Sequence, residues 1–362
     1  MIKFGRIFAT SKFGSLDLLC NPISVFERSF VLILKNCLFV AKNALRAALL
    51  LICVSIVCFF LVSFSPIDPL QVNVGQTALG SMSSEQIQKL ETYWGVGTPA
   101  TERFLYWASD FLRGDMGVSL LYRQNVFDIL ITKLSYSLPL LIIAWTLSGA
   151  FGFLLGVISG VNRGKFIDKL IRTYCIVISS TPTFWIGLVL LLVFAVQLNI
   201  LPIGLGVPIG IESSNVTIWN RLHHAILPAF TLSITGISHI ALHTREKIID
   251  VMQSDYVLFA KARGESHWDI IKNHALRNTL LPAITLHFAS ISEILGGSIL
   301  IEQVFSYPGL GQAAVRAGLG SDIPLLLAIT IISTSIVFIG NFTANTLYTV
   351  IDPRVGGGSD KL

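Results

Sequence analysis

The chain has 362 residues, of which 53% are hydrophobic and only 13% are charged, and its mean hydropathy is +0.71. Charged residues make up about a quarter of an ordinary soluble protein, so this composition excludes a soluble globular chain and indicates an integral membrane protein. The net charge of +5 does not indicate nucleic-acid binding, because membrane proteins concentrate Lys and Arg in their cytoplasmic loops. None of the five cysteines falls in a segment expected on the extracytoplasmic side, so no disulfide is predicted.

Residues 1–46 are rich in Lys and Arg and are predicted to be a cytoplasmic leader, with an interfacial amphipathic helix around Phe30–Val40. Residues 47–64 are apolar almost without interruption and are long enough to cross about 30 Å of hydrocarbon. A cleaved signal peptide is the alternative, but no small-residue cleavage site follows. The segment is therefore interpreted as an uncleaved first membrane span.

Residues 65–133 are polar and are predicted to be extracytoplasmic, with a short helix at Ser83–Tyr93 capped by Ser83 or Ser84. Residues 134–351 are predicted to form the core, and residues 352–362 a cytoplasmic tail. Five further spans are predicted within this core, at about residues 135–160, 173–198, 226–244, 279–301 and 324–350. The span at 226–244 has the weakest signal, because Pro, Ser, Thr and His residues interrupt it.

Six spans place both termini on the same side of the membrane. The segments on that side hold 19 of the 26 Lys and Arg residues, and the segments on the other side hold the remaining seven. The excess of positive charge predicts that both termini, and the segment 245–278, face the cytoplasm.

The sequence shows no catalytic constellation, and no cofactor is expected. His239 and His243 are spaced to share one helix face and could bind a metal, but no third ligand accompanies them. Pore lining or helix-to-helix hydrogen bonding is the favoured interpretation of this pair. The glycines at 204–210 lack the following Lys-Ser/Thr of a phosphate-binding loop. The chain is therefore not expected to hydrolyse ATP by itself.

Charge within the predicted spans is sparse, and Glu293 is the clear case. An ionisable group is costly in hydrocarbon, so Glu293 is expected to line a pathway or to make a hydrogen-bonded helix contact, and the two interpretations are left open. Four glycines recur every three or four residues in the predicted second span and favour close helix packing: Gly149, Gly152, Gly156 and Gly160.

The segment 245–278 carries two helical patterns that meet at Gly264. One apolar stripe comes before this glycine and another after it; the stripes comprise Ile249, Met252, Tyr256 and Phe259, then Trp268, Ile271, Ala275 and Leu276. Gly264 is predicted to end the first helix, and Ser266 with Asp269 to form the capping box of the second. Periodicity alone leaves open whether the segment lies on the membrane or docks on a protein.

The same segment resembles the cytoplasmic coupling loop of ABC-importer permease subunits, in the dipeptide, oligopeptide and nickel branch. The matching residues are Asp255-Tyr256-Val257, Ala260, Ala262, Gly264, His274-Ala275-Leu276-Arg277-Asn278 and Pro282. The resemblance covers about 300 residues, from near Ser65 to Val355. It also includes Pro66-Ile67-Asp68-Pro69, Arg113-Gly114-Asp115-Met116-Gly117, Leu201-Pro202, the run from Ile301 to Gly311, and Asp352-Pro353-Arg354.

The resemblance implies an all-α, polytopic membrane protein with six transmembrane helices of the type I ABC-importer permease fold. It implies a bacterial inner-membrane location and a transport subunit that is not itself an enzyme. The implied partners are a second homologous permease, two cytoplasmic ATPase subunits and an extracytoplasmic substrate-binding protein. The residues implied in ATPase coupling are Asp255, Tyr256, Ala260, Ala262, Arg263, Gly264, Arg277 and Asn278.

Three departures from the wider family are visible. Leu258-Phe259-Ala260 stands where other importers have Glu-Ala-Ala, Asn345 stands where an Asp is common, and the leader is long. The substrate stays open among small peptides, nickel and metal chelates. The alternative function is an ATP-independent channel or secondary transporter, for which several intramembrane charges or a filter motif would be expected. Glu293, His239 and His243 are the candidate pathway residues.

Overall fold

The structure is a computed structural model that describes residues 22–64, 74–75, 79, 82–93, 97–208, 210 and 216–351; for 22–40, 91–93 and 348–351 it describes the helical backbone alone. The chain divides into two compact units, residues 1–50 and residues 51–362. Over the described ranges the protein is helical and contains no strand, only an isolated bridge between Val118 and Asn125. An all-α fold is therefore confirmed. The predicted tail and the Pro66–Pro69 motif lie outside the described residues.

The helices follow one another in a simple order. They are α1 (Pro22–Ser63), α4 (Ser84–Tyr93), α5 (Ala100–Leu112), α6 (Val126–Val161), α7 (Phe166–Ser179), α8 (Thr183–Leu190), the π-helix η1 (Leu191–Gln197), α9 (Ile218–Met252), α10 (Asp255–Ala262), α11 (His267–Ile270), the π-helix η3 (Ile271–Leu276), α12 (Arg277–Ala289), α13 (Ile291–Val304), α14 (Leu310–Leu319) and α15 (Ile323–Ile351). The short helix predicted near residue 83 is α4, and Ser83 is its cap, because its hydroxyl accepts from the Gln86 amide at 3.3 Å.

Four helical stretches of the described residues are long and apolar enough to cross a membrane: Ala41–Ser63, Val126–Val161, Ile218–Met252 and Ile323–Leu347. Two bent pairs raise the number to six if each pair is counted as one span. These are Phe166–Ser179 with Thr183–Gln197, bent by 104°, and His267–Ala289 with Ile291–Val304, bent by 44°. The multi-pass character is confirmed, whereas the count of six spans stays a prediction. The span predicted at about 173–198 coincides with the first bent pair, and it bends because Pro182 has no amide hydrogen to continue α7.

The leader also differs from the prediction. A separate interfacial helix was expected around Phe30–Val40, with the first span beginning at residue 47. Instead, a single helix, α1, runs over Pro22–Ser63 without a break. The sequence from Pro22 onward has no glycine and no further proline before Pro66, so it offers no residue that would interrupt a helix.

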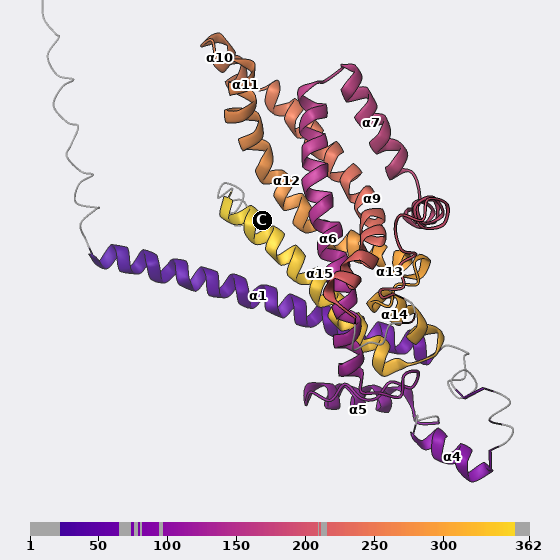
Figure 1. Ribbon diagram of the computed structural model, residues 1–362. Helices are drawn as coiled ribbons and strands as arrows, with labels where there is room; N and C mark the ends of the chain where they lie inside the picture. Colours follow the sequence, from indigo (N-terminus) through magenta and orange to yellow (C-terminus); the bar gives the residue numbers. More distant parts are fainter. Residues whose placement is uncertain are drawn as a thin grey trace, which may run out of the picture. The chain divides into compact units, whose positions relative to one another are not determined.

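Helix α9 is the central element of unit 51–362, and α6 packs along it (Figure 1). Three glycines on α6 make this contact possible. A Cβ atom on Gly152, Gly156 or Gly160 would lie 2.5–2.7 Å from the Cβ atom of a residue on α9, in turn Ile240, Thr244 and Ile248. Residues four apart form a ridge on α9, and the glycines form the groove that receives it. The close packing predicted for this glycine stripe is confirmed.

The run from Ile301 to Gly311 folds around a buried carboxylate. Glu302 is fully buried, and its two oxygens accept from the Ser137 hydroxyl at 2.7 Å and the Gln312 amide at 3.0 Å. A Cβ on Gly309 would lie 2.4 Å from a Glu302 oxygen, and a Cβ on Gly311 would lie 2.6 Å from the Ile299 Cα. Any larger residue at position 309 or 311 would therefore collide with Glu302 or Ile299.

A second buried carboxylate, Asp322, holds the start of α15. It accepts from the Ser119 hydroxyl at 2.5 Å and from the amides of Leu121 and Leu325 at 3.1 and 3.3 Å. Both residues are bonded to α14, Glu302 through the Gln312 amide and Asp322 through the Ala317 carbonyl. Helix α14 lies at one end of the helices, and α10 and α11 lie at the opposite end (Figure 1).

Candidate functional site

The segment that links α9 to α12 folds back on itself through three short helices. Helix α9 ends at Met252, Ser254 precedes α10, and Gly264 follows α10 with a φ of +83°. This φ lies in the left-handed region that favours glycine. Ser266 then caps α11, since its hydroxyl accepts from the Asp269 amide at 3.2 Å. The predicted glycine corner and serine cap are confirmed.

The inner side of this segment is anchored by a small apolar core. Its buried members come from α9, α10, α11 and η3, and they are Ile248, Val251, Val257, Ala260, Ile270 and Ala275. Val157 and Val161, in the last turns of α6, pack against this cluster. The segment is therefore held firmly against the ends of α6 and α9, which a hairpin lying on lipid alone would not need.

The outer side of the segment exposes large apolar side chains. Leu258 is 67% exposed, Phe259 66% and Trp268 76%, and Tyr256 is exposed as well. These four residues are called the docking face below. Isolated apolar side chains at a surface need no explanation, but a group of four on one small segment is typical of a site that contacts a protein or the membrane surface.

The docking face corrects the predicted stripes. Tyr256 and Phe259 belong to the apolar stripe of a helix predicted to continue α9, but the helix breaks at Gln253–Ser254, and the buried residues of α10 are Val257 and Ala260. In the second predicted stripe, Ile271 and Ala275 are buried together with Ile270, whereas Trp268 is exposed. The prediction of one continuous helix up to Gly264 is therefore wrong, because the chain breaks at Gln253–Ser254.

Polar residues of the segment pair with one another and with one member of the docking face. Glu265 lies 3.0 Å from His274 and 3.7 Å from Arg263, and the Asn278 side-chain amide donates to the Tyr256 hydroxyl at 3.3 Å. Asp255, Ala262, Arg263, Gly264, Arg277 and Asn278 are all exposed, as Tyr256 is. The structure thus brings the predicted coupling residues together on one segment, with Ala260 alone turned inward.

A buried ion pair fixes the root of this segment. Arg245 on α9 donates to Asp168 on α7 at 2.6 and 2.9 Å, and both side chains are buried. Asp168 also accepts from the Ser159 hydroxyl at 2.6 Å and from the Gly164 amide at 2.7 Å. The pair was not predicted, because no local pattern relates residues 77 positions apart in sequence.

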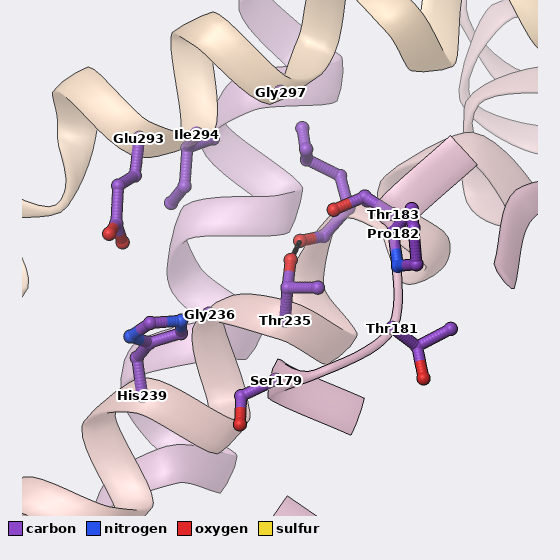
Figure 2. Close-up of a pocket in the computed structure, with 11 residues that line it drawn as sticks. Ser179, Thr181, Pro182, Thr183, Thr235, Gly236, His239, Glu293, Ile294 and Gly297 are labelled. Carbon is purple, nitrogen blue, oxygen red and sulfur yellow. Dashed lines mark hydrogen bonds between the residues drawn. The ribbon is translucent and has the colours of Figure 1, made fainter. Parts of the chain in front are cut away.

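Glu293 and His239 line one cavity of about 240 Å³ (Figure 2). Glu293 points from α13 toward His239 on α9, and the bend at 181–183 between α7 and α8 closes the other side. Four hydroxyl groups complete the polar lining: Ser179, Thr181, Thr183 and Thr235. A carboxylate, an imidazole and several hydroxyls suit a polar solute that can donate and accept hydrogen bonds. The sequence had offered the two ionisable residues, but not the bend that encloses them.

His243 does not line this cavity; it lies one turn along α9, in a second cavity. Among the residues that the structure describes, no group of three or more His, Cys, Asp or Glu side chains could hold a metal ion.

Comparisons with known proteins agree on one family. The family described as the binding-protein-dependent transport system inner membrane component matches residues 152–357. The oligopeptide transport system permease protein AppB of Bacillus subtilis (strain 168) is 30% identical over 320 residues, which cover 88% of this chain and 98% of AppB. The di/tripeptide transport system permease protein DppB of Pseudomonas aeruginosa (strain UCBPP-PA14) is 30% identical over 318 residues, covering 83% and 94%.

A solved structure of an amino acid ABC transporter with histidines covers 63% of this chain and 94% of its own, at 17% identity and a TM-score of 0.44. That likeness is too low to support an argument by itself. The agreement therefore depends on the sequence comparisons.

Proposed function

Since this chain belongs to the family of inner-membrane components of binding-protein-dependent transport systems, we propose that it is the permease subunit of an ATP-driven importer of short peptides. The family and the relatives support a multi-pass inner-membrane transport subunit of the ABC type. The peptide substrate and the identity of the partners are the proposal. Peptides are favoured over nickel or metal chelates because the relatives just described are named as oligopeptide and di/tripeptide permeases.

The docking face is the observation that carries this proposal. Four large apolar side chains stand out from a segment that its own buried core and the Asp168–Arg245 pair hold rigidly. The surrounding Arg, Lys and Asp residues make the rim polar, as in other protein interfaces. We assign this face to an ATPase subunit in the cytoplasm, where the distribution of Lys and Arg is expected to place it.

The transport path is proposed along the open side of α9. Most of this helix is buried, but His239, His243 and Lys247, four residues apart, are exposed on one face. Glu293 faces the same region through the first cavity. Polar residues at membrane depth are tolerated where they border water or another protein chain. A second permease facing this strip would enclose a polar path between the two chains.

The experiment compares three variants in cells that carry the whole transport system. Phe259→Asp places a charge on the docking face and, because the side chain is 66% exposed, should leave the chain folded in the membrane. Gly264→Val strains a backbone that lies at φ +83°, by roughly 1–2 kcal/mol. Gly210→Val is the matched control, since Gly210 has a φ of +85° and, like Gly264, open space around its Cβ position.

Three quantities are measured: the amount of chain in the membrane, the ATPase that co-purifies with it, and peptide uptake. We expect Phe259→Asp and Gly264→Val to reach the membrane normally but to lose ATPase co-purification and uptake. Gly210→Val should keep its ATPase. Normal ATPase co-purification with Phe259→Asp would show that the docking face is not the ATPase contact.

A further inference from the structure

Two fully buried threonines on neighbouring helices have hydroxyl groups without a hydrogen-bond partner. Thr244 on α9 is 1% exposed and Thr279 on α12 is 0% exposed, and neither Oγ1 atom is paired. Both residues line a second cavity, of about 230 Å³. A buried hydroxyl usually finds a partner, because leaving it unpaired costs free energy. Two such groups in one cavity point to a ligand that would satisfy both.

The geometry of α9 explains why the Thr244 hydroxyl is free to act. The Cβ and Cγ2 atoms of Thr244 fill the groove on α6, where a Cβ on Gly156 would come within 2.9 Å of both. This contact fixes the methyl group toward α6 and leaves the hydroxyl for the opposite side. Thr231, a fully buried threonine earlier on the same helix, instead donates to the Leu227 carbonyl at 2.8 Å. Thr231 is thus paired, whereas the two threonines that line the cavity are not.

The charges around the cavity are positive. Lys247 and His243 line it from α9, and no carboxylate is among the described residues that line it. The adjacent acidic residue, Glu246, is already paired with Arg245. Pro282, Ala283 and Leu286 of α12 form an apolar wall that weakens the competition from water. Hydroxyl and ammonium donors beside an apolar wall are suited to bind an oxyanion.

We propose that this cavity between α9 and α12 binds a phosphate-type oxyanion, held by the ammonium group of Lys247 and the hydroxyls of Thr244 and Thr279. His243 adds a fourth donor when its ring nitrogen on that side is protonated. The oxyanion has two possible sources, the headgroup of an anionic lipid or a free phosphate. The volume of about 230 Å³ is several times the roughly 30 Å³ that one water occupies, so it admits either. This site does not depend on the transport proposal.

The test uses the purified full-length chain in a neutral detergent. One arm titrates inorganic phosphate and records the midpoint of thermal unfolding. The other arm adds phosphatidylglycerol and measures the bound lipid by native mass spectrometry. A response in the first arm alone indicates free phosphate, and retention in the second indicates the lipid headgroup. Either response, if it depends on the residues below, supports the site.

The variants Lys247→Gln and Thr279→Val probe the two kinds of donor. We expect Lys247→Gln to weaken binding roughly tenfold or more, and Thr279→Val to weaken it several-fold. Without ligand, Thr279→Val should be at least as stable as the native chain, because a methyl group replaces an unpaired hydroxyl. A loss of binding in a stable variant therefore cannot be attributed to misfolding.

Two matched controls are available. Thr231→Val removes a buried hydroxyl that is paired and lies away from the cavity, and Lys169→Gln removes an exposed charge on α7. Both should bind phosphate or lipid like the native chain. The proposal is overturned if neither ligand binds, or if Lys247→Gln and Thr279→Val bind as well as these controls.

Discussion

The Asp168–Arg245 pair offers the sharpest test of how the docking segment is held. Replacing Asp168 with Ala leaves a buried guanidinium whose Nε and Nη2 groups lose their acceptors, and it also removes the acceptor of the Ser159 hydroxyl and the Gly164 amide. Breaking a buried ion pair from one side costs about 3–5 kcal/mol. The two further unpaired donors place Asp168→Ala near the upper end of that range. The remaining contact of Arg245 with Glu246 offsets only part of this loss.

The assay is a double-mutant cycle on the purified chain, with unfolding followed by heat or denaturant. Asp168→Ala, Arg245→Leu and the double variant are compared with the native chain. We expect the double variant to be less destabilised than the sum of the two single variants, by at least about 1 kcal/mol, because no unpaired charge is left buried. Peptide uptake should fall most in Asp168→Ala, since Arg245 precedes the docking segment on α9.

The exposed pair Glu85–Lys89 serves as the control, with a similar distance of 3.0 Å but side chains that are 75% exposed or more. Glu85→Ala should change the free energy of unfolding by about 0.5 kcal/mol or less. If the effects of Asp168→Ala and Arg245→Leu simply add, the two residues are not coupled. The reasoning that makes this pair the root of the docking segment would then be refuted.

Two further predictions concern packing and pH. Gly156→Ala should destabilise the chain by about 1–3 kcal/mol in thermal unfolding, because its Cβ would lie 2.5 Å from the Thr244 Cβ. Gly296→Ala is the control and should leave stability unchanged, because no atom lies within 4 Å of its Cβ position. Equal stability of the two variants would contradict the proposed groove. Burial raises the pKa of the Asp322 carboxyl above its ordinary value, against the opposing effect of the Ser119 hydroxyl, so protonation is favoured by folding. That stabilisation is complete below the unfolded pKa of about 3.9 and is lost as the pH rises through the folded pKa. The unfolding midpoint of the native chain should therefore fall relative to Asp322→Asn as the pH rises above about 4, and parallel curves would disprove this.

Hydropathy predicted the apolar segments well, because each long apolar run has to leave water whatever its neighbours are. The weakest predicted span, 226–244, is part of α9. Its polar residues are tolerated because 72% of the residues in the apolar stretch of α9 are buried inside the protein and do not face lipid. The bend at Pro182 could have been found, since the residue before a proline avoids helical geometry. The fold of 301–311 around Glu302 could not, because its partner Ser137 lies 165 residues away.

The turn and the cap of the docking segment were predictable because they depend on neighbouring residues, whereas its outer face depends on a break in the helix and was not predicted. A left-handed turn at Gly264 and a cap at Ser266 depend on a few neighbouring residues, and the sequence displays them directly. Which side of α10 is buried depends on the break at Gln253–Ser254, which shifts the register of every residue after it.

This shift has a functional consequence. Had the helix been continuous, Tyr256 and Phe259 would have extended the stripe of Ile249 and Met252 along α9. The break buries the smaller Val257 and Ala260 instead and turns the large side chains outward. The inner core requires little space, so the segment can lie close to α6 and α9 and still offer apolar area to a partner. The large exposed members of the predicted stripes, Tyr256, Phe259 and Trp268, are therefore residues that we expect to contact the ATPase.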